Sequence, residues 1–318
     1  MTTGAASWGF DAEVQAYVER VENFFAGDLA GFEITDQRRQ YVDFCRGFAV
    51  SPPPGIDIRD ATLDGRAGPV PIRIYRPSSQ GPQPCLLFIH GGGWVFGDLD
   101  SHHSECADLA EATGTTVIAV AYRLAPEHPY PAALEDAWDV LTVIATEAAA
   151  FGIDAERIGV GGDSAGGNIA AGMALRARDR GGPDIAAQFL IYPALGGNDG
   201  LASYTEFADA PLLTTAGMKL YAMLYCGSEW FTDDPLLAPL RADDLSGLPP
   251  AFLQPAGVDP LRDDSVAYEE RLRRAGVETD LVIEDGLPHS FLRARHSTEK
   301  GRAAFARLCA AIRSRLSH

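Results

Sequence analysis

The chain of 318 residues carries 44 acidic and 26 basic side chains, a formal net charge of −18, and 46% of its residues are hydrophobic. This composition is ordinary for a globular protein with one large core. The acidic balance argues against nucleic acid or an anionic membrane surface as a partner, because binding to either needs basic patches.

Targeting and redox features predict a cytoplasmic protein. The N-terminal residues lack the basic region and the apolar stretch of a signal peptide. No apolar run approaches the roughly 20 residues of a membrane-spanning helix, so we expect no stable membrane anchor. The cysteines are odd in number and have neither disulfide-framework nor zinc-site spacing; they are Cys45, Cys85, Cys106, Cys226 and Cys309.

The first part of the chain predicts helices followed by a hairpin. Within residues 1–50, apolar side chains at spacings of three and four residues form a stripe typical of a helix, and they are Val14, Tyr17, Val18, Val21, Phe24 and Phe25. The sequence Ser-Pro-Pro-Pro-Gly over 51–55 breaks this pattern. Residues 56–77 predict two strands joined around Asp64 and Gly65.

From about residue 84 the chain alternates short apolar runs with longer helical segments. Continuous apolar strands separated by helices are typical of a mostly parallel sheet with helices on both faces, so we predict an α/β fold. Strands are predicted over 85–90, 117–122, 158–162, 188–193, 251–257 and 279–284. Helices are predicted over 102–112, 132–150, 165–179, 264–275 and 298–316.

Residues 195–248 interrupt this alternation, and we interpret them as an insertion. A helix is predicted there over 215–226, with Thr214 and Thr215 as its N-cap. Together with the N-terminal helices, the insertion is expected to form a helical cap over the carboxyl edge of the sheet. The predicted division is 1–50 as the N-terminal part of the cap, 51–194 as the first part of the core, 195–248 as the cap insertion and 249–318 as the second part of the core.

Ser164 has the surroundings of a catalytic nucleophile. It lies in Gly-Asp-Ser-Ala-Gly, between a predicted strand and a predicted helix. A strand-to-helix turn sharp enough to expose a serine needs almost no side chain at Gly162 and Gly166, which is the basis of the G-x-S-x-G nucleophile elbow of α/β-hydrolases. The start of the helix also favours developing negative charge near the N–H of Ala165.

A second motif, His90-Gly91-Gly92-Gly93-Trp94, follows the strand predicted over 85–90. Three consecutive glycines let the backbone direct N–H groups at a substrate oxygen. Acyl transfer places negative charge on that oxygen, and loops of the HGGG type supply the oxyanion hole of esterases.

In an α/β-hydrolase, an acid and a base must follow the serine in the chain. Of the downstream histidines, His318 is the last residue and His296 lies in an Arg-rich stretch that we interpret as a solvated helical face. We therefore predict His289, in a loop after the last predicted strand, as the general base.

Asp259 is the predicted acid. It follows the strand predicted over 251–257, which places its carboxylate at the same sheet edge as the serine and the histidine. Asp263 and Asp264 are alternatives, although Asp264 is better interpreted as a helix N-cap. The acid holds the imidazole tautomer and stabilises the imidazolium without taking the proton itself.

The remaining histidines do not predict a metal site. His102 and His103 are adjacent, so they point apart on a helix, and no second ligand cluster is in view. His128 lies in a proline-rich loop, Tyr122-Arg-Leu-Ala-Pro-Glu127-His-Pro-Tyr-Pro131, that we expect to buttress the site. We predict neither a metal nor an organic cofactor.

The combination of HGGGW, YRLAPE, GDSAGGN, a DPL segment and a late His-Ser-Phe resembles the hormone-sensitive-lipase-like esterases, also called bacterial family IV. The match runs in order over about residues 60–295. The resemblance implies the triad Ser164, Asp259 and His289, with oxyanion amides from Gly92, Gly93 and Ala165 and with Gly91 shaping the loop. It also implies short- to medium-chain carboxylic esters as substrates, and dimerisation is common among similar proteins.

These observations predict ester hydrolysis through an acyl-enzyme. Two alternatives remain: an amidase or lactonase that uses the same triad, and a small-ligand receptor without turnover. Candidate pocket residues of the cap, each of which could equally serve packing, are Tyr17, Phe24, Phe25, Leu212, Leu213, Met218, Tyr221 and Tyr225.

Overall fold

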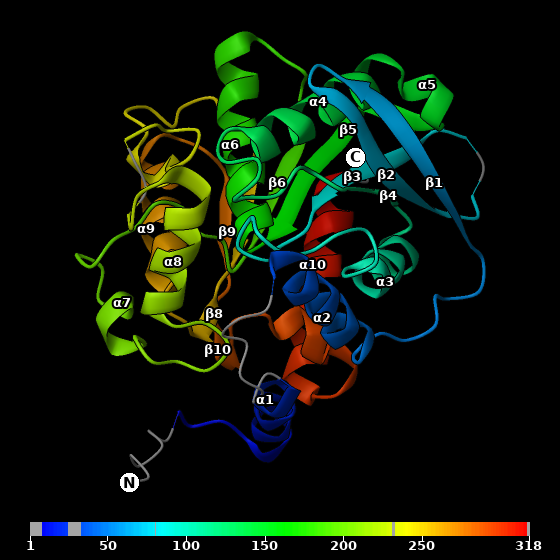
Figure 1. The fold of residues 1–318 in the computed structure, drawn as a ribbon. Helices are drawn as coiled ribbons and strands as arrows, with labels where there is room; N and C mark the ends of the chain where they lie inside the picture. Colours follow the sequence, from blue (N-terminus) through cyan, green and yellow to red (C-terminus); the bar gives the residue numbers. More distant parts are fainter. Residues whose placement is uncertain (1–7, 25–32, 80, 231–232, 317–318) are drawn as a thin grey trace, which may run out of the picture.

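The computed structural model describes residues 8–24, 33–79, 81–230 and 233–316, and an eight-stranded sheet lies at its centre (Figure 1). The first two strands form an antiparallel hairpin that joins the rest antiparallel, and all other pairings are parallel. The predicted mostly parallel α/β fold is therefore confirmed. Across the sheet the strands are β1 (Ile56–Gly65), β2 (Gly68–Pro77), β4 (Thr116–Val120), β3 (Gln83–Ile89), β5 (Ile153–Asp163), β6 (Ala187–Ile191), β7 (Ala251–Gln254) and β9 (Thr279–Leu281).

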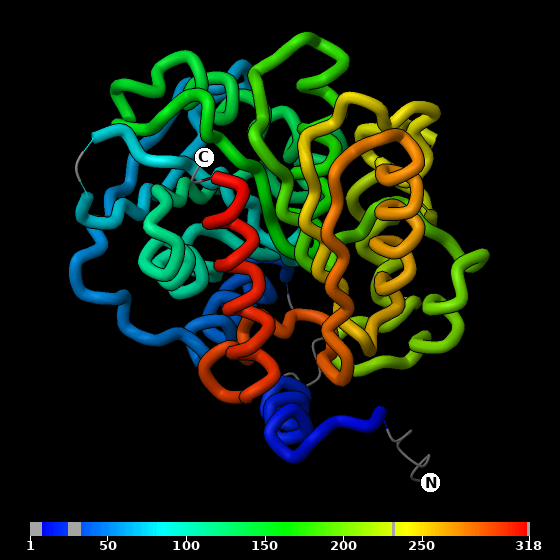
Figure 2. Tube along the Cα trace, turned by 180° about the vertical axis from the view of Figure 1, so that it is seen from behind, coloured from blue at the N-terminus to red at the C-terminus, as the bar shows by residue number. Residues whose placement is uncertain are grey.

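Helices cover both faces of the sheet, and α10 crosses one of them in Figure 2. The packing of the central strand β3 explains why its residues after Gln83 are apolar. Leu86 and Phe88 pack with the helices of one face, whereas Leu87 and Ile89 pack with those of the other. One face carries α3 (His103–Thr113) and α10 (Glu299–Leu316); the other carries α4 (Ala132–Thr146), α6 (Ala165–Arg180) and α9 (Arg262–Arg274).

A second, two-stranded sheet was not predicted. The expected strand over 251–257 is divided at Pro255, and its second half, β8 (Ala256–Val258), leaves the large sheet. β8 pairs in parallel with β10 (Glu284–Pro288), and Val258 lies opposite Pro288. The residues that follow these two strands, Asp259 and His289, are consequently brought side by side.

Helices from both predicted cap segments lie beside the carboxyl ends of the parallel strands (Figure 1). The N-terminal segment supplies α1 (Ala12–Phe24) and α2 (Ile34–Arg46), and the insertion supplies α7 (Ser203–Glu206) and α8 (Thr215–Cys226). The helix predicted over 215–226 is confirmed, and Thr214 caps it by accepting a hydrogen bond from the Gly217 N–H at 2.9 Å. Phe25 lies outside the described residues.

Other element boundaries differ in detail. The helix predicted over 132–150 is divided at Glu147 into α4 and the short α5 (Ala148–Phe151). Two 3-10 helices, η1 (Pro239–Arg241) and η2 (Phe291–His296), were not predicted.

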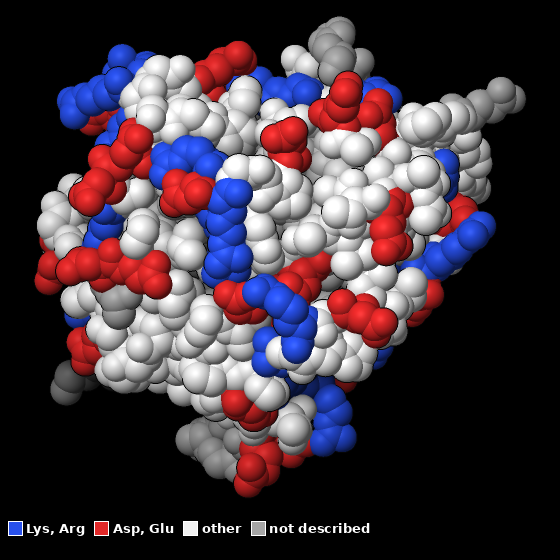
Figure 3. Space-filling model, turned by 90° about the horizontal axis from the view of Figure 1, so that it is seen from above, with Lys and Arg blue, Asp and Glu red and all other residues white. Residues whose placement is uncertain are grey.

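The surface charge is mixed on the face seen in Figure 3, where acidic and basic side chains are interspersed. Among the residues that the structure describes, no helix combines the length and the apolar character needed to cross a bilayer.

Candidate active site

Ser164 occupies the turn between β5 and α6 in a strained backbone conformation, with φ of 55° and ψ of −117°. The turn is held by the Ser164 N–H, which donates to the Ile191 carbonyl at 2.9 Å. The flanking glycines are required by space. A Cβ at Gly162 or Gly166 would lie 2.2 Å or 1.9 Å from the carbonyl oxygen of Ile89. The predicted elbow geometry therefore has a steric cause that the sequence pattern alone could only suggest.

The three predicted triad side chains lie in hydrogen-bonding order. The Nε2 atom of His289 lies 2.9 Å from Ser164 Oγ, and its Nδ1 atom lies 2.6 Å from Asp259 Oδ2. The other oxygen of Asp259 accepts the Leu261 N–H at 2.9 Å. With its proton on Nδ1, the ring donates to Asp259 and leaves Nε2 to accept the serine hydroxyl proton. Asp259 is fully buried and His289 is 5% exposed, so water does not screen this array.

The glycine loop faces the same serine. Gly92 and Gly93 line the cavity that contains Ser164, and both have positive φ angles, of 118° and 62°. Gly91 differs, because its N–H donates to the Asp163 carboxylate at 2.8 Å and is not available to a substrate. The three glycines of the motif therefore divide into two that face the cavity and one that anchors the loop.

His90, the histidine that begins the motif, stabilises the glycine loop through a hydrogen bond. Burial lowers the pKa of His90 to about 3, so the ring is neutral and its Nδ1–H donates to the Gly91 carbonyl at 2.8 Å. His90 stacks on Tyr122, with ring centroids 4.2 Å apart. The Tyr122 hydroxyl donates to the His90 carbonyl at 2.9 Å. The YRLAPE segment thus contacts the glycine loop, as predicted.

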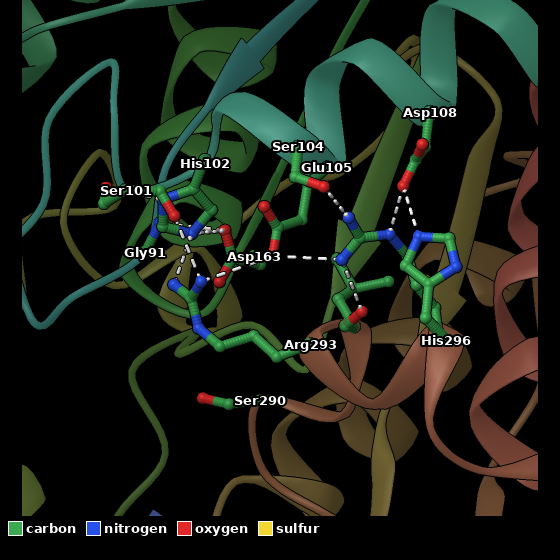
Figure 4. Close-up of polar contacts among 12 residues, drawn as sticks. Gly91, Ser101, His102, Ser104, Glu105, Asp108, Asp163, Ser290, Arg293 and His296 are labelled. Atoms are coloured by element: carbon green, nitrogen blue, oxygen red, sulfur yellow. Dashed lines mark hydrogen bonds and ion pairs between the residues drawn. The ribbon is translucent and has the colours of Figure 1, made fainter. Parts of the chain in front are cut away.

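A buried ionic network extends from the nucleophile elbow (Figure 4). Asp163 lies 3.2 Å from His102, which lies 3.3 Å from Arg293. Arg293 continues to Glu105 on α3 at 3.2 Å. Burial opposes ionisation of Asp163, but the adjacent His102, Arg293 and Gly91 N–H outweigh it and lower its pKa to about 2. The carboxylate is therefore held ionised beside Ser164.

The interpretation of residues 293–296 as a solvated helical face is wrong for the two arginines, although His296 itself is exposed. Arg293 and Arg295 are only 4% and 2% exposed. Arg295 pairs with Asp108 at 2.7 Å and with Glu105 at 3.2 Å, and His296 contacts Asp108 at 2.8 Å. A sequence signal did exist, because Glu105 and Asp108 are three residues apart on a helix and so project from the same face.

The alternative acids do not face His289. Asp264 is a buried residue within the first turn of α9. Its carboxylate accepts hydrogen bonds from the N–H groups of Leu195 and Gly197, at 2.7 Å and 3.2 Å, so the interpretation of Asp264 as an N-cap is wrong. Burial raises its pKa to about 6. Asp263 accepts the Ser203 N–H at 2.9 Å. Both carboxylates thus bind the first residues of the insertion.

Two adjoining cavities lie between the sheet edge and the helices α1, α2 and α8. The one at Ser164 has a volume of 90 Å³, and its neighbour has a volume of 530 Å³. Of the predicted cap residues, Leu212, Leu213 and Tyr221 line both, Met218 lines only the smaller and Tyr17 only the larger. Tyr225 packs behind them against Trp94, with stacked rings 4.7 Å apart. Phe24, on α1, lines neither cavity and is 39% exposed.

The described residues contain no group of three or more His, Cys, Asp or Glu side chains arranged to hold a metal ion. His102 belongs to the ionic network, and the Nδ1 atom of His103 lies 3.0 Å from the Tyr75 hydroxyl.

Comparison with known proteins identifies the family of the chain. A family model described as having the alpha/beta hydrolase fold matches residues 86–293. The chain belongs to this family. It is 44% identical over 243 residues to Esterase LipI of Mycobacterium tuberculosis, covering 75% of this chain and 76% of the relative. It is 35% identical over 297 residues to an ethyl acetate hydrolase of Pseudomonas putida, covering 88% and 91%.

Solved structures also show that the chain is similar to α/β hydrolases. The chain superposes with a TM-score of 0.91 on the Ser161Ala mutant of LAE6, an α/β hydrolase from the metagenome of Lake Arreo, at 33% identity and over 97% of this chain and 99% of that chain. The resemblance to hormone-sensitive-lipase-like esterases and the predicted enzyme class, a carboxylic ester hydrolase, are confirmed.

Proposed function

We propose that this enzyme hydrolyses short- to medium-chain carboxylic esters through an acyl-enzyme on Ser164, with His289 as general base and Asp259 as the acid that orients it. One observation carries the proposal: His289 lies 2.9 Å from the serine hydroxyl and 2.6 Å from the buried carboxylate. Such an array activates a serine that would otherwise be a weak nucleophile.

In the first step, His289 Nε2 takes the proton of Ser164 as the oxygen attacks the ester carbonyl. The imidazolium that forms is stabilised by Asp259, which remains ionised. Collapse of the tetrahedral intermediate breaks the ester bond, and His289 returns the proton to the departing alcohol. Water then repeats the sequence on the acyl-enzyme, which releases the carboxylic acid and regenerates the serine.

The proposed oxyanion hole consists of the N–H groups of Gly92, Gly93 and Ala165. Gly92 and Gly93 line the cavity of Ser164, and Ala165 is the first residue of α6, where the helix dipole favours negative charge. Gly91 shapes the loop through its bond to Asp163. Because these groups are fixed before the substrate arrives, each is expected to contribute about 10²–10³-fold to the rate.

The substrate class follows from the cavity and from the relatives. The space at the serine is only 90 Å³, and one of the relatives is an ethyl acetate hydrolase. Both favour a short chain at the reacting carbonyl. Every proposed step uses groups of the chain itself, so we propose no metal or organic cofactor, and EDTA should leave the rate unchanged.

We further propose that α1, α2 and residues 195–248 act as the cap, and that the enzyme is cytoplasmic. The free cysteines, four of them buried, support a reducing compartment. Cell fractionation tests the location, and light scattering distinguishes a monomer from a homodimer.

The central test is labelling by a phosphonate ester followed by mass spectrometry. We expect a single adduct on Ser164, and Ser164→Ala should lose turnover on p-nitrophenyl acetate by on the order of 10⁶-fold, as when other serine triads lose their nucleophile. Far-ultraviolet circular dichroism should show the fold unchanged. An adduct elsewhere, or normal turnover by the variant, would refute the assignment. Comparing an ester with its matched amide tests for amidase activity.

A further inference from the structure

We propose that Tyr17 on α1 is a positioning residue for the general base: its hydroxyl fixes the backbone carbonyl of Ser290 and so keeps His289 in line with the other two triad residues. The inference rests on the proposed function, because it takes His289 as the base. It goes further by giving the N-terminal helix a part in the rate of the reaction, through a side chain that does not line the cavity of Ser164.

His289 lies on a short connection between two regular elements. β10 ends at Pro288, and η2 begins at Phe291. Only His289 and Ser290 separate them. Ser290 adopts a left-handed conformation, with φ of 61° and ψ of 24°. A residue with a side chain rarely takes this conformation unless its surroundings hold it there. The backbone that carries the imidazole therefore depends on contacts from outside the connection.

The Ser290 carbonyl accepts two hydrogen bonds, and they differ in origin. One comes from the Arg293 N–H at 3.2 Å, within the first turn of η2. The other comes from the Tyr17 hydroxyl at 2.9 Å, on a helix 273 residues earlier in the chain. Tyr17 is only 3% exposed, and burial raises the pKa of its hydroxyl, so the group stays protonated and remains a donor. The second bond thus fixes the connection to an element outside the β10–η2 segment.

α1 packs along the segment to which Tyr17 binds (Figure 2). Its buried side chains belong to the same core cluster as Tyr192, whose ring lies against His289 with centroids 4.7 Å apart. Beyond η2, the Glu13 carboxylate accepts the Glu299 N–H at 2.5 Å. α1 therefore contacts the chain both before and after η2, and these contacts hold the Tyr17 hydroxyl in a fixed place.

Tyr17→Phe tests the proposal, because it removes the hydroxyl and keeps the ring. His289 acts as base in both acylation and deacylation, so a displaced imidazole should slow the two steps alike. We therefore expect kcat and kcat/KM on p-nitrophenyl acetate to fall together by about 10-fold, with KM unchanged. Far-ultraviolet circular dichroism should show that the variant is folded.

Proton NMR supplies a measurement that a purely structural role would not change. The Nδ1 proton of His289 lies in the 2.6 Å hydrogen bond to Asp259, and such a short, charge-assisted bond places its proton at low field. The resonance is assigned by its absence in His289→Gln. In Tyr17→Phe it should shift or broaden, because the ring is no longer held in place against the carboxylate.

Tyr268→Phe is the matched control. Tyr268 is a fully buried tyrosine of α9, and its hydroxyl has no hydrogen-bond partner among the residues that the structure describes. Removing that hydroxyl should change neither kcat nor the resonance.

Four outcomes would overturn the inference: an equal effect of the two substitutions, an unchanged kcat in Tyr17→Phe, a rise in its KM, or a fall in kcat with an unchanged resonance. A wild-type enzyme without ester turnover, or labelling away from Ser164, would instead refute the proposed function.

Discussion

The carboxylate of Asp163 accepts a hydrogen bond from the backbone N–H of Gly91 at 2.8 Å. Asp163 directly precedes Ser164, and Gly91 begins the glycine loop, so a single side chain fixes the distance between the two. The same carboxylate lies 3.2 Å from His102, which connects it to Arg293. Arg293 lies four residues after His289. The elbow, the glycine loop and the segment after the histidine are thus joined by buried charges as well as by the sheet.

Asp163→Asn tests this connection. The amide oxygen can still accept the Gly91 N–H, but the charge that faces His102 and Arg293 is lost. Removing one member of a buried ionic group should lower the free energy of unfolding by about 3 kcal/mol, and misplacement of the loop should lower kcat. Urea denaturation and initial rates measure both. The exposed Asp179→Asn, which breaks the pair with Arg178, should change stability by no more than about 0.5 kcal/mol. Equal effects of the two substitutions would contradict the buried-network interpretation.

Gly166→Ala tests the steric requirement of the elbow. A Cβ there would lie 1.9 Å from the Ile89 carbonyl oxygen, so the β5–α6 turn must move away from β3. We expect loss of nearly all ester hydrolysis and a fall in thermal midpoint. Gly114→Ala provides the contrast, because its φ is 68° but a Cβ would meet no atom within 4 Å. It should cost only the left-handed backbone penalty, about 1–2 kcal/mol, and retain activity. Full activity in Gly166→Ala would show that the turn can relax.

Local motifs were sufficient to predict the side chains that meet at the candidate site. Gly162 and Gly166 mark the elbow in the sequence because the space around them excludes a Cβ. Asp259 and His289 were predicted because each follows an apolar run, and such runs end at one edge of a parallel sheet. The sequence did not reveal that β8 and β10 leave the main sheet and pair with each other, since the single break at Pro255 is compatible with an ordinary loop.

The buried arginines show where sequence patterns fail. Arg293 and Arg295 resemble surface residues in any hydrophobicity pattern, because a charge is rarely buried without a partner. Their partners, Glu105 and Asp108, lie on α3, more than 180 residues earlier in the chain. Asp264 was misinterpreted for the same reason, because its hydrogen-bond partners, two backbone N–H groups and the Tyr204 hydroxyl, belong to residues 195–248. Long-range polar partners decide burial in these cases, and a local window around each of these residues does not contain its partners.

The cysteines provide a test of the nucleophile that is independent of Ser164. Burial raises the pKa of Cys45 and Cys309 to about 12, and it also raises the pKa of Cys85, Cys106 and Cys226. Thiolates should therefore be scarce at neutral pH, and iodoacetamide should leave ester hydrolysis unchanged. Titration with a thiol reagent should detect few groups in the native protein and all five in urea. Inactivation in step with modification of one cysteine would contradict this prediction.

Arg38 on α2 binds the segments around Val95 and Glu127, and this contact should respond to pH. Its guanidinium forms two bonds of 2.7 Å with Glu127, and it also donates to the carbonyls of Val95 and Ala125 at 2.8 Å. The bonds from Arg38 lower the pKa of Glu127 from 4.5 to about 2. A carboxyl whose pKa is lower in the folded state stabilises the protein above its unfolded pKa and loses that contribution as the pH falls toward the folded value. Glu127→Gln should therefore be less stable than wild type at pH 6, and the difference should shrink by pH 3.

Urea unfolding at a series of pH values measures this difference directly, and taking it between wild type and variant removes the common effect of the protein's high acidic charge. The exposed Glu111→Gln on α3 is the matched control and should show a small difference that does not vary with pH. If the difference in free energy of unfolding between wild type and Glu127→Gln stayed constant from pH 6 to pH 3, the Arg38–Glu127 contact would act through shape and hydrogen bonding, without a contribution from the ionised carboxylate. A stability difference that disappears in acid would place the Arg38–Glu127 ion pair among the contacts that hold α2 against the rest of the protein.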